Sequence, residues 1–106
     1  MKEESGGRKD DQGKLRYDLI PWDPGMIEVA RVYTLGAAKY GDRNWQKGIT
    51  YSRMFAALMR HLFAYWLKWE RYDSENGQHH LASVIFYCLA FMYFDVTGGE
   101  GLNDRA

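Results

Sequence analysis

The chain has 106 residues, of which 46% are hydrophobic and 16% aromatic, and its 14 basic and 14 acidic side chains give a formal charge of zero. This length suits one domain with a real core, and the neutral balance gives no reason to expect a nucleic-acid partner. The single cysteine, Cys88, excludes an internal disulfide and fits a reducing, cytoplasmic location. It lies in an apolar run, so we expect it to be buried.

Residues 1–13 are polar, lack the apolar stretch of a secretory signal and predict a flexible N-terminus. Charged residues then alternate with Leu15, Tyr17 and Leu19, which predicts an extended arm lying along a helical body. Asp23 and Pro24 follow as a helix N-cap acid and a proline suited to the first helical position. We therefore expect a helix over about 24–39.

A loop over Tyr40–Gly48 is predicted by its glycines and its Asp and Asn residues. Two long apolar patterns joined by a polar turn follow, and they predict helices over about 52–71 and 78–97. The fold class is then all-α, with three main helices and an extended N-terminal arm. Residues 14–97 form a single helical domain, and 98–106 are a polar tail.

The third expected helix is apolar nearly all round, since Leu81–Phe94 carries no charge. That run is shorter than the ~20 residues a membrane span requires, so we expect no membrane contact. Burial on several sides is the better explanation, yet a chain this small has few other helices to provide it. We therefore expect a homo-oligomer, either a dimer or a tetramer, that completes a helical bundle.

Basic residues are concentrated before residue 61, and arginine and lysine are the side chains that hold phosphates. Lys39 and Arg43 flank a glycine-bearing loop whose N–H groups could also face an anion. Trp45 could stack on a nucleobase while Asn44 reads its edge. Solvated surface charge is the alternative for each basic residue. The candidate substrate-binding residues are Lys14, Arg16, Lys39, Arg43, Asn44, Trp45 and Arg60.

The turn Glu70–His80 holds five possible metal ligands within eleven residues. His61 lies about two and a half helical turns before Glu70, so the two can share an ion only if the third helix bridges them. Carboxylate oxygens suit Mg²⁺ or Mn²⁺, whereas imidazole suits Mn²⁺ or Zn²⁺. The pattern leaves open whether His79 or His80 faces the site. The candidate catalytic and metal-binding residues are His61, Glu70, Asp73 and His80.

Several segments occur in a characteristic order: Lys14-Leu-Arg-Tyr-Asp-Leu-Ile-Pro21, then Lys39-Tyr-Gly-Asp-Arg-Asn-Trp45, then Arg60-His-Leu62 and Asp73-x-Glu-x-Gly-x-His-His-Leu81. Together they resemble a family of small phage-borne proteins described as dATP/dGTP diphosphohydrolases. That family is usually grouped with the all-α, MazG-like nucleoside triphosphate pyrophosphohydrolases. The resemblance implies hydrolysis of a purine deoxynucleoside triphosphate to the monophosphate and pyrophosphate, assisted by Mg²⁺ or Mn²⁺. For a phage-encoded protein, the host cytoplasm is the expected location.

One departure from the wider MazG-like group concerns the metal site. That group binds metals through a Glu-x-x-Glu pair on one helix and a Glu-x-x-Asp pair on the next. Here the corresponding positions hold Ala57-x-x-Arg60 and His80-x-x-Ser83. The metal site is therefore built differently, weakened or absent, and Glu28, Glu70 and Asp73 are the acids left to supply it. The alternative function is a non-catalytic, nucleotide- or protein-binding helical oligomer, and a third is a purely structural role.

Overall fold

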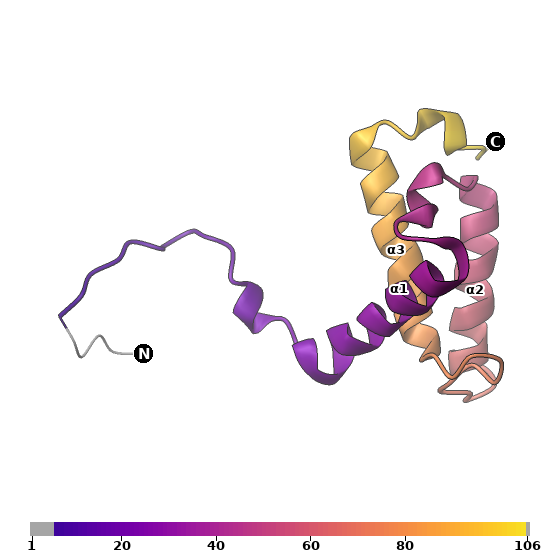
Figure 1. The fold of residues 1–106 in the computed structure, drawn as a ribbon, viewed down its shortest axis with the longest axis horizontal. Coiled ribbons are helices and arrows are strands. Elements are labelled where there is room, and N and C mark those ends of the chain that lie inside the picture. The colour runs from indigo at the N-terminus through magenta and orange to yellow at the C-terminus, as the bar shows by residue number, and fades with distance from the viewer. Residues whose placement is uncertain (1–5, 106) are drawn as a thin grey trace.

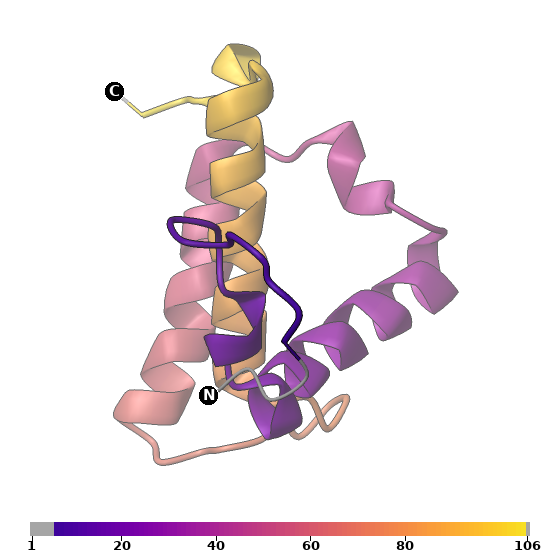
Figure 2. The same ribbon diagram turned by 90° about the vertical axis from the view of Figure 1, so that its left-hand side faces the viewer.

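The computed structural model describes residues 6–105 and is built from three α-helices: α1 over Ile27–Tyr40, α2 over Tyr51–Trp66 and α3 over His80–Thr97. Helices α2 and α3 run antiparallel side by side, and α1 crosses them at an angle while packing against α3 (Figures 1 and 2). Within the described residues the only β pairing is an isolated bridge. The all-α prediction is confirmed. Short helical turns lie at Tyr17–Leu19, Trp22–Met26, Asn44–Lys47 and Glu100–Leu102.

The core lies between the start of α2 and the end of α3. Tyr51 and Met54 are one helical turn apart on α2, and Ala90 and Phe94 are one turn apart on α3, so each pair presents one face to the other helix. The Tyr51 hydroxyl also donates a hydrogen bond of 2.7 Å to Asp95 at the end of α3. This contact fixes the open end of the hairpin.

Helix α3 is long and apolar enough to cross a membrane when judged by length and composition alone. In this fold it packs against α2 on one side and α1 on another, and 28% of its residues are buried. Its outer side remains open, however. Cys88 lies there and is exposed, so the expectation of a buried cysteine is wrong.

Helix α2 ends at Trp66 rather than at residue 71, because the chain reverses there. Trp69 has a left-handed backbone (φ +54°), and the N–H of Glu70 donates to the carbonyl of Ala64 at 3.0 Å. This hydrogen bond spans one residue more than the long bond of a Schellman C-cap, and tryptophan has the left-handed backbone that glycine usually adopts at a helix end. The polar turn therefore begins earlier than the apolar pattern suggested.

Helix α1 is preceded by a wide turn over Trp22–Met26 in which Asp23 is extended (φ −124°, ψ 119°). The N–H of Met26, which an Asp23 cap would have bound, instead donates to the carbonyl of Pro21. No side chain caps the start of α1. The expected N-cap role of Asp23 is therefore wrong, although a helix near residues 24–39 is present.

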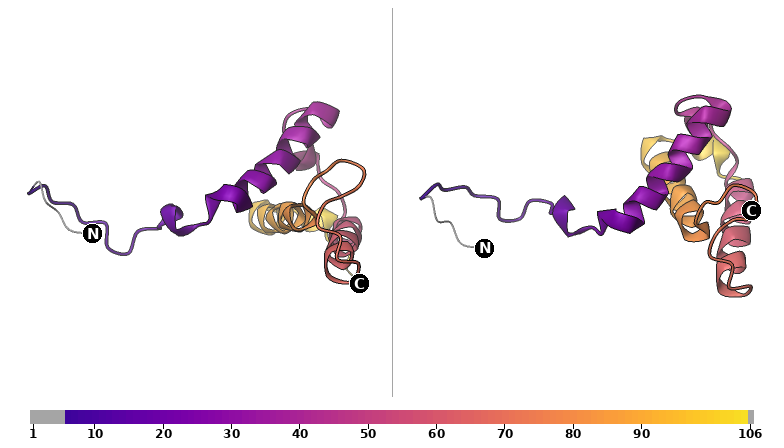
Figure 3. Two further views of the ribbon diagram at one scale, coloured as in Figure 1. Left: turned by 90° about the horizontal axis from the view of Figure 1, so that it is seen from below. Right: turned by 60° about the horizontal axis from the view of Figure 1, so that its bottom comes forward.

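The N-terminal arm projects away from the helices instead of lying along them (Figures 1 and 3). Leu15, Tyr17 and Leu19 are each more than 60% exposed. Arg16 is held within the arm, because its guanidinium pairs with Asp18 at 2.7 Å. The alternating pattern of the arm gives it an apolar side, but no helix face of the same chain meets that side.

Residues after α3 fold back onto the start of α2. Gly98 has φ +95° at the end of α3, a conformation that favours glycine. Beyond it, Asp104 accepts hydrogen bonds from both the N–H and the hydroxyl of Ser52, at 2.8 and 2.6 Å. Asp104 thereby binds one of the free N–H groups at the start of α2, which is what the side chain of an N-cap residue does.

Candidate functional site

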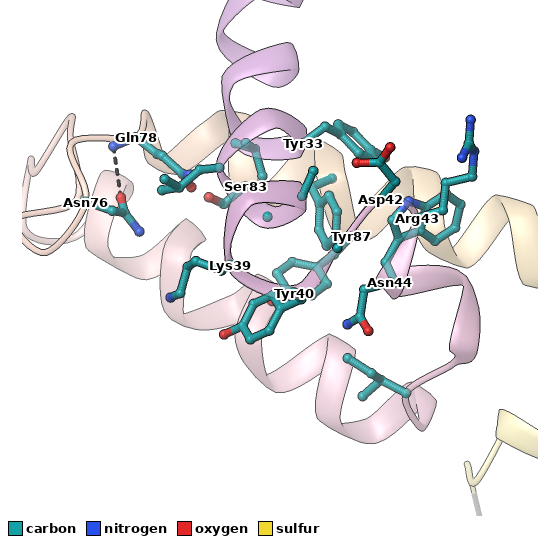
Figure 4. A pocket seen from close by; sticks show the side chains of 18 of the residues that line it. Tyr33, Lys39, Tyr40, Asp42, Arg43, Asn44, Asn76, Gln78, Ser83 and Tyr87 are labelled. Carbon is teal, nitrogen blue, oxygen red and sulfur yellow. Dashed lines mark hydrogen bonds between the residues drawn. The ribbon is translucent and has the colours of Figure 1, made fainter.

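A cavity of about 650 Å³ lies between the C-terminal half of α1, the loop that follows it, and α3, and it reaches the turn between α2 and α3 (Figure 4). This volume is within the range of small-molecule sites, about 300–1,000 Å³. The lining includes the acid Asp42, and it also combines aromatic rings, side-chain amides and two cations. These are Tyr33, Tyr40, Phe86 and Tyr87; Asn44, Asn76 and Gln78; and Lys39 and Arg43.

The cations come from the segment that joins α1 to α2. Gly41 ends α1 with φ +97°, and Arg43 follows with a left-handed backbone (φ +57°), so the chain turns sharply across the cavity mouth. Lys39 and Arg43 lie on opposite sides of Tyr40 and Tyr87 (Figure 4). Among residues 6–105 neither cation takes part in a salt bridge, so both charges are available to an anionic ligand.

The opposite wall is supplied by His61 and the polar turn. In that turn the N–H of Asp73 donates to the carbonyl of Gln78, and the N–H of Gln78 donates to the Asn76 side chain (Figure 4). The Asp73 carboxylate accepts the N–H of Glu75 at 2.8 Å. These bonds hold the turn in one conformation and leave the second carboxylate oxygen of Asp73 unused.

Three side chains form a continuous hydrogen-bonded chain behind this wall. Nε2 of His80 lies 2.7 Å from a carboxylate oxygen of Glu70, and Nδ1 of His80 lies 2.8 Å from Nδ1 of His61. His80 is 4% exposed, so its ring is almost fully enclosed. His80 is the first residue of α3, and it bridges Glu70 and His61. The sequence spacing of Glu70 and His61 had indicated that only the third helix could connect them.

The hydrogen-bond partners limit the proton positions. An ionised carboxylate only accepts, so His80 donates from Nε2 to Glu70, and Nδ1 of a neutral His80 accepts the Nδ1–H of His61. Burial, and secondarily the neighbouring His80, lower the pKa of His61. His61 is therefore neutral near pH 7.

A possible metal site lies at the same place. His61, Asp73 and His80 each present one ligand atom, and these three atoms lie within 4.8 Å of one another. Glu70 is outside this group, because it contacts the opposite edge of the His80 ring. His79 is outside it too: its ring accepts the N–H of Leu81 as the N-cap of α3 and packs against Tyr65 and Tyr72. Of the two adjacent histidines, His80 faces the site.

Comparison with known proteins gives a family for this arrangement. The family described as "dATP/dGTP diphosphohydrolase, N-terminal" matches residues 4–105. The chain belongs to this family. It is also 44% identical over 100 residues to a dATP/dGTP diphosphohydrolase of Salmonella phage PMBT28, a match that covers 93% of this chain and 33% of the relative. The chain thus spans about a third of the length of that relative. No solved structure matches it.

The structure gathers part of the substrate-binding set expected from the sequence of this family member. Lys39, Arg43, Asn44 and Trp45 line the cavity. Trp45 also packs against the core, with its ring centroid 5.0 Å from that of Tyr93, so only part of the indole can face a ligand.

The remaining expected substrate contacts do not reach the cavity. Lys14 and Arg16 lie on the projecting arm, and Arg60 is exposed on α2 outside the cavity lining. The arm positions were expected to pack along the helical body, and its projection is the reason they lie apart. Arg60 is exposed and is not a lining residue, although the next residue in the sequence, His61, does line the cavity.

Several lining residues were not singled out from the sequence. Tyr33, Phe86 and Tyr87 were indistinguishable there from ordinary core aromatics, because their helices are rich in apolar residues. Asn76 and Gln78 lie in the turn that was singled out, and amides next to candidate ligands were a usable signal. Ser83, one turn after His80, is buried and also lines the cavity.

Proposed function

We propose that this chain hydrolyses a purine deoxynucleoside triphosphate, dATP or dGTP, to the monophosphate and pyrophosphate, with Mg²⁺ or Mn²⁺ as cofactor. The observation that supports this most is one cavity with two different walls. Lys39 and Arg43 supply positive charge on one wall. On the other wall lies His61, which forms a cluster with Asp73 and His80. The name of the phage relative is consistent with the same chemistry.

In this proposal the aromatic part of the cavity receives the purine. Tyr33 and Phe86 pack with ring centroids 5.0 Å apart, and Tyr87 adjoins Phe86, which gives an apolar surface against a flat base. Asn44, on the loop, offers both a donor and an acceptor for the edge of the base. The aromatic and amide groups in this part of the cavity suit a nucleobase better than they suit a simple anion.

The phosphates then lie between Lys39 and the cluster. Water adds to the α-phosphorus, the bond from that phosphorus to the α–β bridging oxygen breaks, and pyrophosphate leaves with one proton released at neutral pH. Lys39 and Arg43 offset the charge of the leaving group, and His61, Glu70, Asp73 and His80 bind the ion or orient the water. A bound divalent ion supplies charge neutralisation and a more acidic water.

The direct test is release of pyrophosphate from dGTP and dATP in the presence of Mn²⁺ or Mg²⁺. We expect equal amounts of monophosphate and pyrophosphate, and no inorganic phosphate. Absence of turnover with either purine nucleotide would remove the enzymatic proposal. Saturable binding of dGTP without turnover or metal requirement would instead favour a binding module, the function that the missing Glu-x-x-Glu and Glu-x-x-Asp pairs suggest.

A cavity variant ties the activity to this site. Gly36 lines the cavity, and a Cβ added there meets no other atom within 4 Å, so Gly36→Leu fills open space without loss of a polar group. Leucine also favours a helix more than glycine does, so folding is preserved. We expect this variant to lose dGTP binding. Ala38→Leu, on the exposed side of the same helix and outside the cavity lining, is the matched control.

A further inference from the structure

We propose that His61, Asp73 and His80 together bind one transition-metal ion, of the Mn²⁺, Co²⁺ or Zn²⁺ class rather than Mg²⁺, and that Glu70 orients His80 without binding the ion. This inference rests on the proposed function and narrows its cofactor from Mg²⁺ or Mn²⁺ to Mn²⁺ or a similar transition-metal ion, because the same ion would face the phosphates. It stands on the donor atoms alone, however, so it can be tested by metal binding in the absence of any nucleotide.

The donor atoms are close enough to share one ion. With metal–ligand distances of about 2.1 Å, two ligands of the same ion lie at most about 4.2 Å apart, and neighbouring ligands about 3 Å apart. The three candidate atoms are within 4.8 Å of one another, and the two Nδ1 atoms are 2.8 Å apart. An atom pair at the 4.8 Å limit must therefore close by about 0.6 Å to lie on opposite sides of one ion, or by about 1.8 Å to be neighbouring ligands.

The ring of His80 divides the roles of the two nearby acids. Its Nδ1 faces His61, and its Nε2 donates to Glu70 on the opposite edge. A metal-binding histidine whose second nitrogen donates to a carboxylate is the common arrangement in protein metal sites, and the carboxylate fixes the tautomer and the ring orientation. Glu70 occupies that outer position, and Asp73 is the acid on the ion side.

The enclosure of the site favours a preformed arrangement. His80 is fixed by its position at the start of α3, by the Glu70 carboxylate and by almost complete burial. Asp73 is fixed by the N–H of Glu75. In the metal-free protein one proton lies between the two Nδ1 atoms, and when both rings are neutral His61 carries it. A shift of that proton to Nε2 exposes two nitrogen lone pairs to the ion with no net change of charge.

Two imidazoles and one carboxylate select for a class of ion. Mg²⁺ strongly prefers oxygen ligands, whereas imidazole suits Mn²⁺, Co²⁺ and Zn²⁺, with affinity rising in that order. The acidic pairs of the wider MazG-like group provide only oxygen. We therefore expect this chain to discriminate among divalent ions differently from a site made of carboxylates.

The experiment is a titration of the full chain with Mn²⁺ alone, followed by electron paramagnetic resonance. We expect one saturable site, and pulsed measurements should show directly bound imidazole nitrogen. Zn²⁺ should displace Mn²⁺, while Mg²⁺ at a hundredfold excess should not. No saturable Mn²⁺ binding, no bound-nitrogen signal, or equal displacement by Mg²⁺ and Zn²⁺ would each overturn the assignment.

Three conservative variants separate the roles. Asp73→Asn keeps an oxygen for the N–H of Glu75 but removes the charge on the ion side, so the Kd for Mn²⁺ should rise at least about tenfold. Glu70→Gln should raise it by about 10- to 100-fold, as for other outer-shell partners, and should retain the nitrogen signal. Glu75→Gln, in the same turn, is the control and should leave the Kd unchanged.

An unchanged Kd in Asp73→Asn, or complete loss of the nitrogen signal in Glu70→Gln, would show that the ligands are assigned wrongly. Circular dichroism on each variant confirms that the helices are intact. Tight Mn²⁺ binding without dGTP hydrolysis would leave this inference standing and remove only the proposed function. Hydrolysis of dGTP by a protein that binds no Mn²⁺ would overturn this inference and leave the proposed hydrolysis standing.

Discussion

The Nδ1 atoms of His61 and His80 lie 2.8 Å apart, although the two residues are nineteen positions apart in the sequence. Two imidazole lone pairs at this distance would repel, so one proton must lie between them, and the Glu70 carboxylate accepts the Nε2–H at the far side of His80. This contact joins the middle of α2 to the first residue of α3. The packing of α2 against α3 therefore includes a hydrogen bond between two side chains as well as apolar contacts.

The first prediction concerns the stability that His80 provides. His80→Ala removes two side-chain hydrogen bonds from a nearly fully buried position and leaves a space behind. We expect the free energy of unfolding, measured in urea without metal, to fall by about 2–3 kcal/mol. Glu75→Ala, in the exposed part of the same turn, should change it by less than about 0.5 kcal/mol. Equal stabilities of the two variants would contradict a structural role for the histidine chain.

A second prediction concerns the left-handed backbone of Trp69. A non-glycine residue in this conformation costs roughly 1–2 kcal/mol, and the Trp69 side chain is 76% exposed, so its packing offsets little of that cost. Both Trp69→Gly and Trp69→Ala remove the ring, but only glycine relieves the backbone. We expect the glycine variant to be more stable than the alanine variant by about 1 kcal/mol. An alanine variant of equal or greater stability would show that φ is not positive in solution.

The sequence predicted those parts of the fold that depend on neighbouring residues, such as the helices and their ends. The helical patterns, the glycine that ends α1 and the glycines after α3 all function as their residue types suggest. The errors arose where distant parts of the chain decide. Nothing near Trp69 shows that α2 stops before it, since tryptophan occupies a position that usually holds glycine.

For the site, residue type indicated which side chains could bind a ligand, but the sequence did not predict which way those side chains point. Helix periodicity could not assign His79 or His80 to the cavity, because the two lie at the helix boundary, where a hydrogen bond to the N–H of Leu81 makes His79 the cap. The arm could not be placed either, because its alternation shows that it has an apolar side without showing what covers that side. Lys14 and Arg16 lie on the projecting arm outside the cavity lining, and their contact with a substrate stays a prediction.

The third prediction tests the charge at the cavity. Lys39 lines it and has no salt-bridge partner among the described residues, so it is free to bind a phosphate. Lys39→Ala should raise the Kd for dGTP about tenfold, which corresponds to about 1.4 kcal/mol. The affinity of the variant should also fall less steeply with salt. Lys47→Ala is the matched control, because Lys47 is on the same connecting segment but outside the cavity lining. Equal effects of the two substitutions would indicate general attraction rather than a site.

The fourth prediction concerns pH and the cap that Asp104 provides. The hydrogen bonds from the hydroxyl and the N–H of Ser52 lower the pKa of Asp104 below its usual value of 3.8. A carboxyl with a lowered pKa in the folded state stabilises that state above the unfolded pKa and loses this effect as the pH falls through the folded pKa. We therefore expect Asp104→Asn to lower the thermal midpoint at pH 7, with a smaller difference from the parent below pH 3.8. Asp10→Asn, on the exposed arm, should show neither effect.

The last prediction concerns self-association. Phe55, Phe63 and Trp66 are about half exposed or more and recur at helical spacing on α2, and Met92 and Val96 do so on the outer side of α3. Two antiparallel helices with exposed apolar stripes can pack against the same pair in a second copy to form a four-helix arrangement. We therefore expect a dimer by light scattering, and the double variant Phe63→Glu/Met92→Glu should be monomeric with its helix content retained. Leu19→Glu, which removes an equally exposed apolar residue from the arm, should remain dimeric. A parent chain that stays monomeric at high concentration would show that this face is not covered by a second copy.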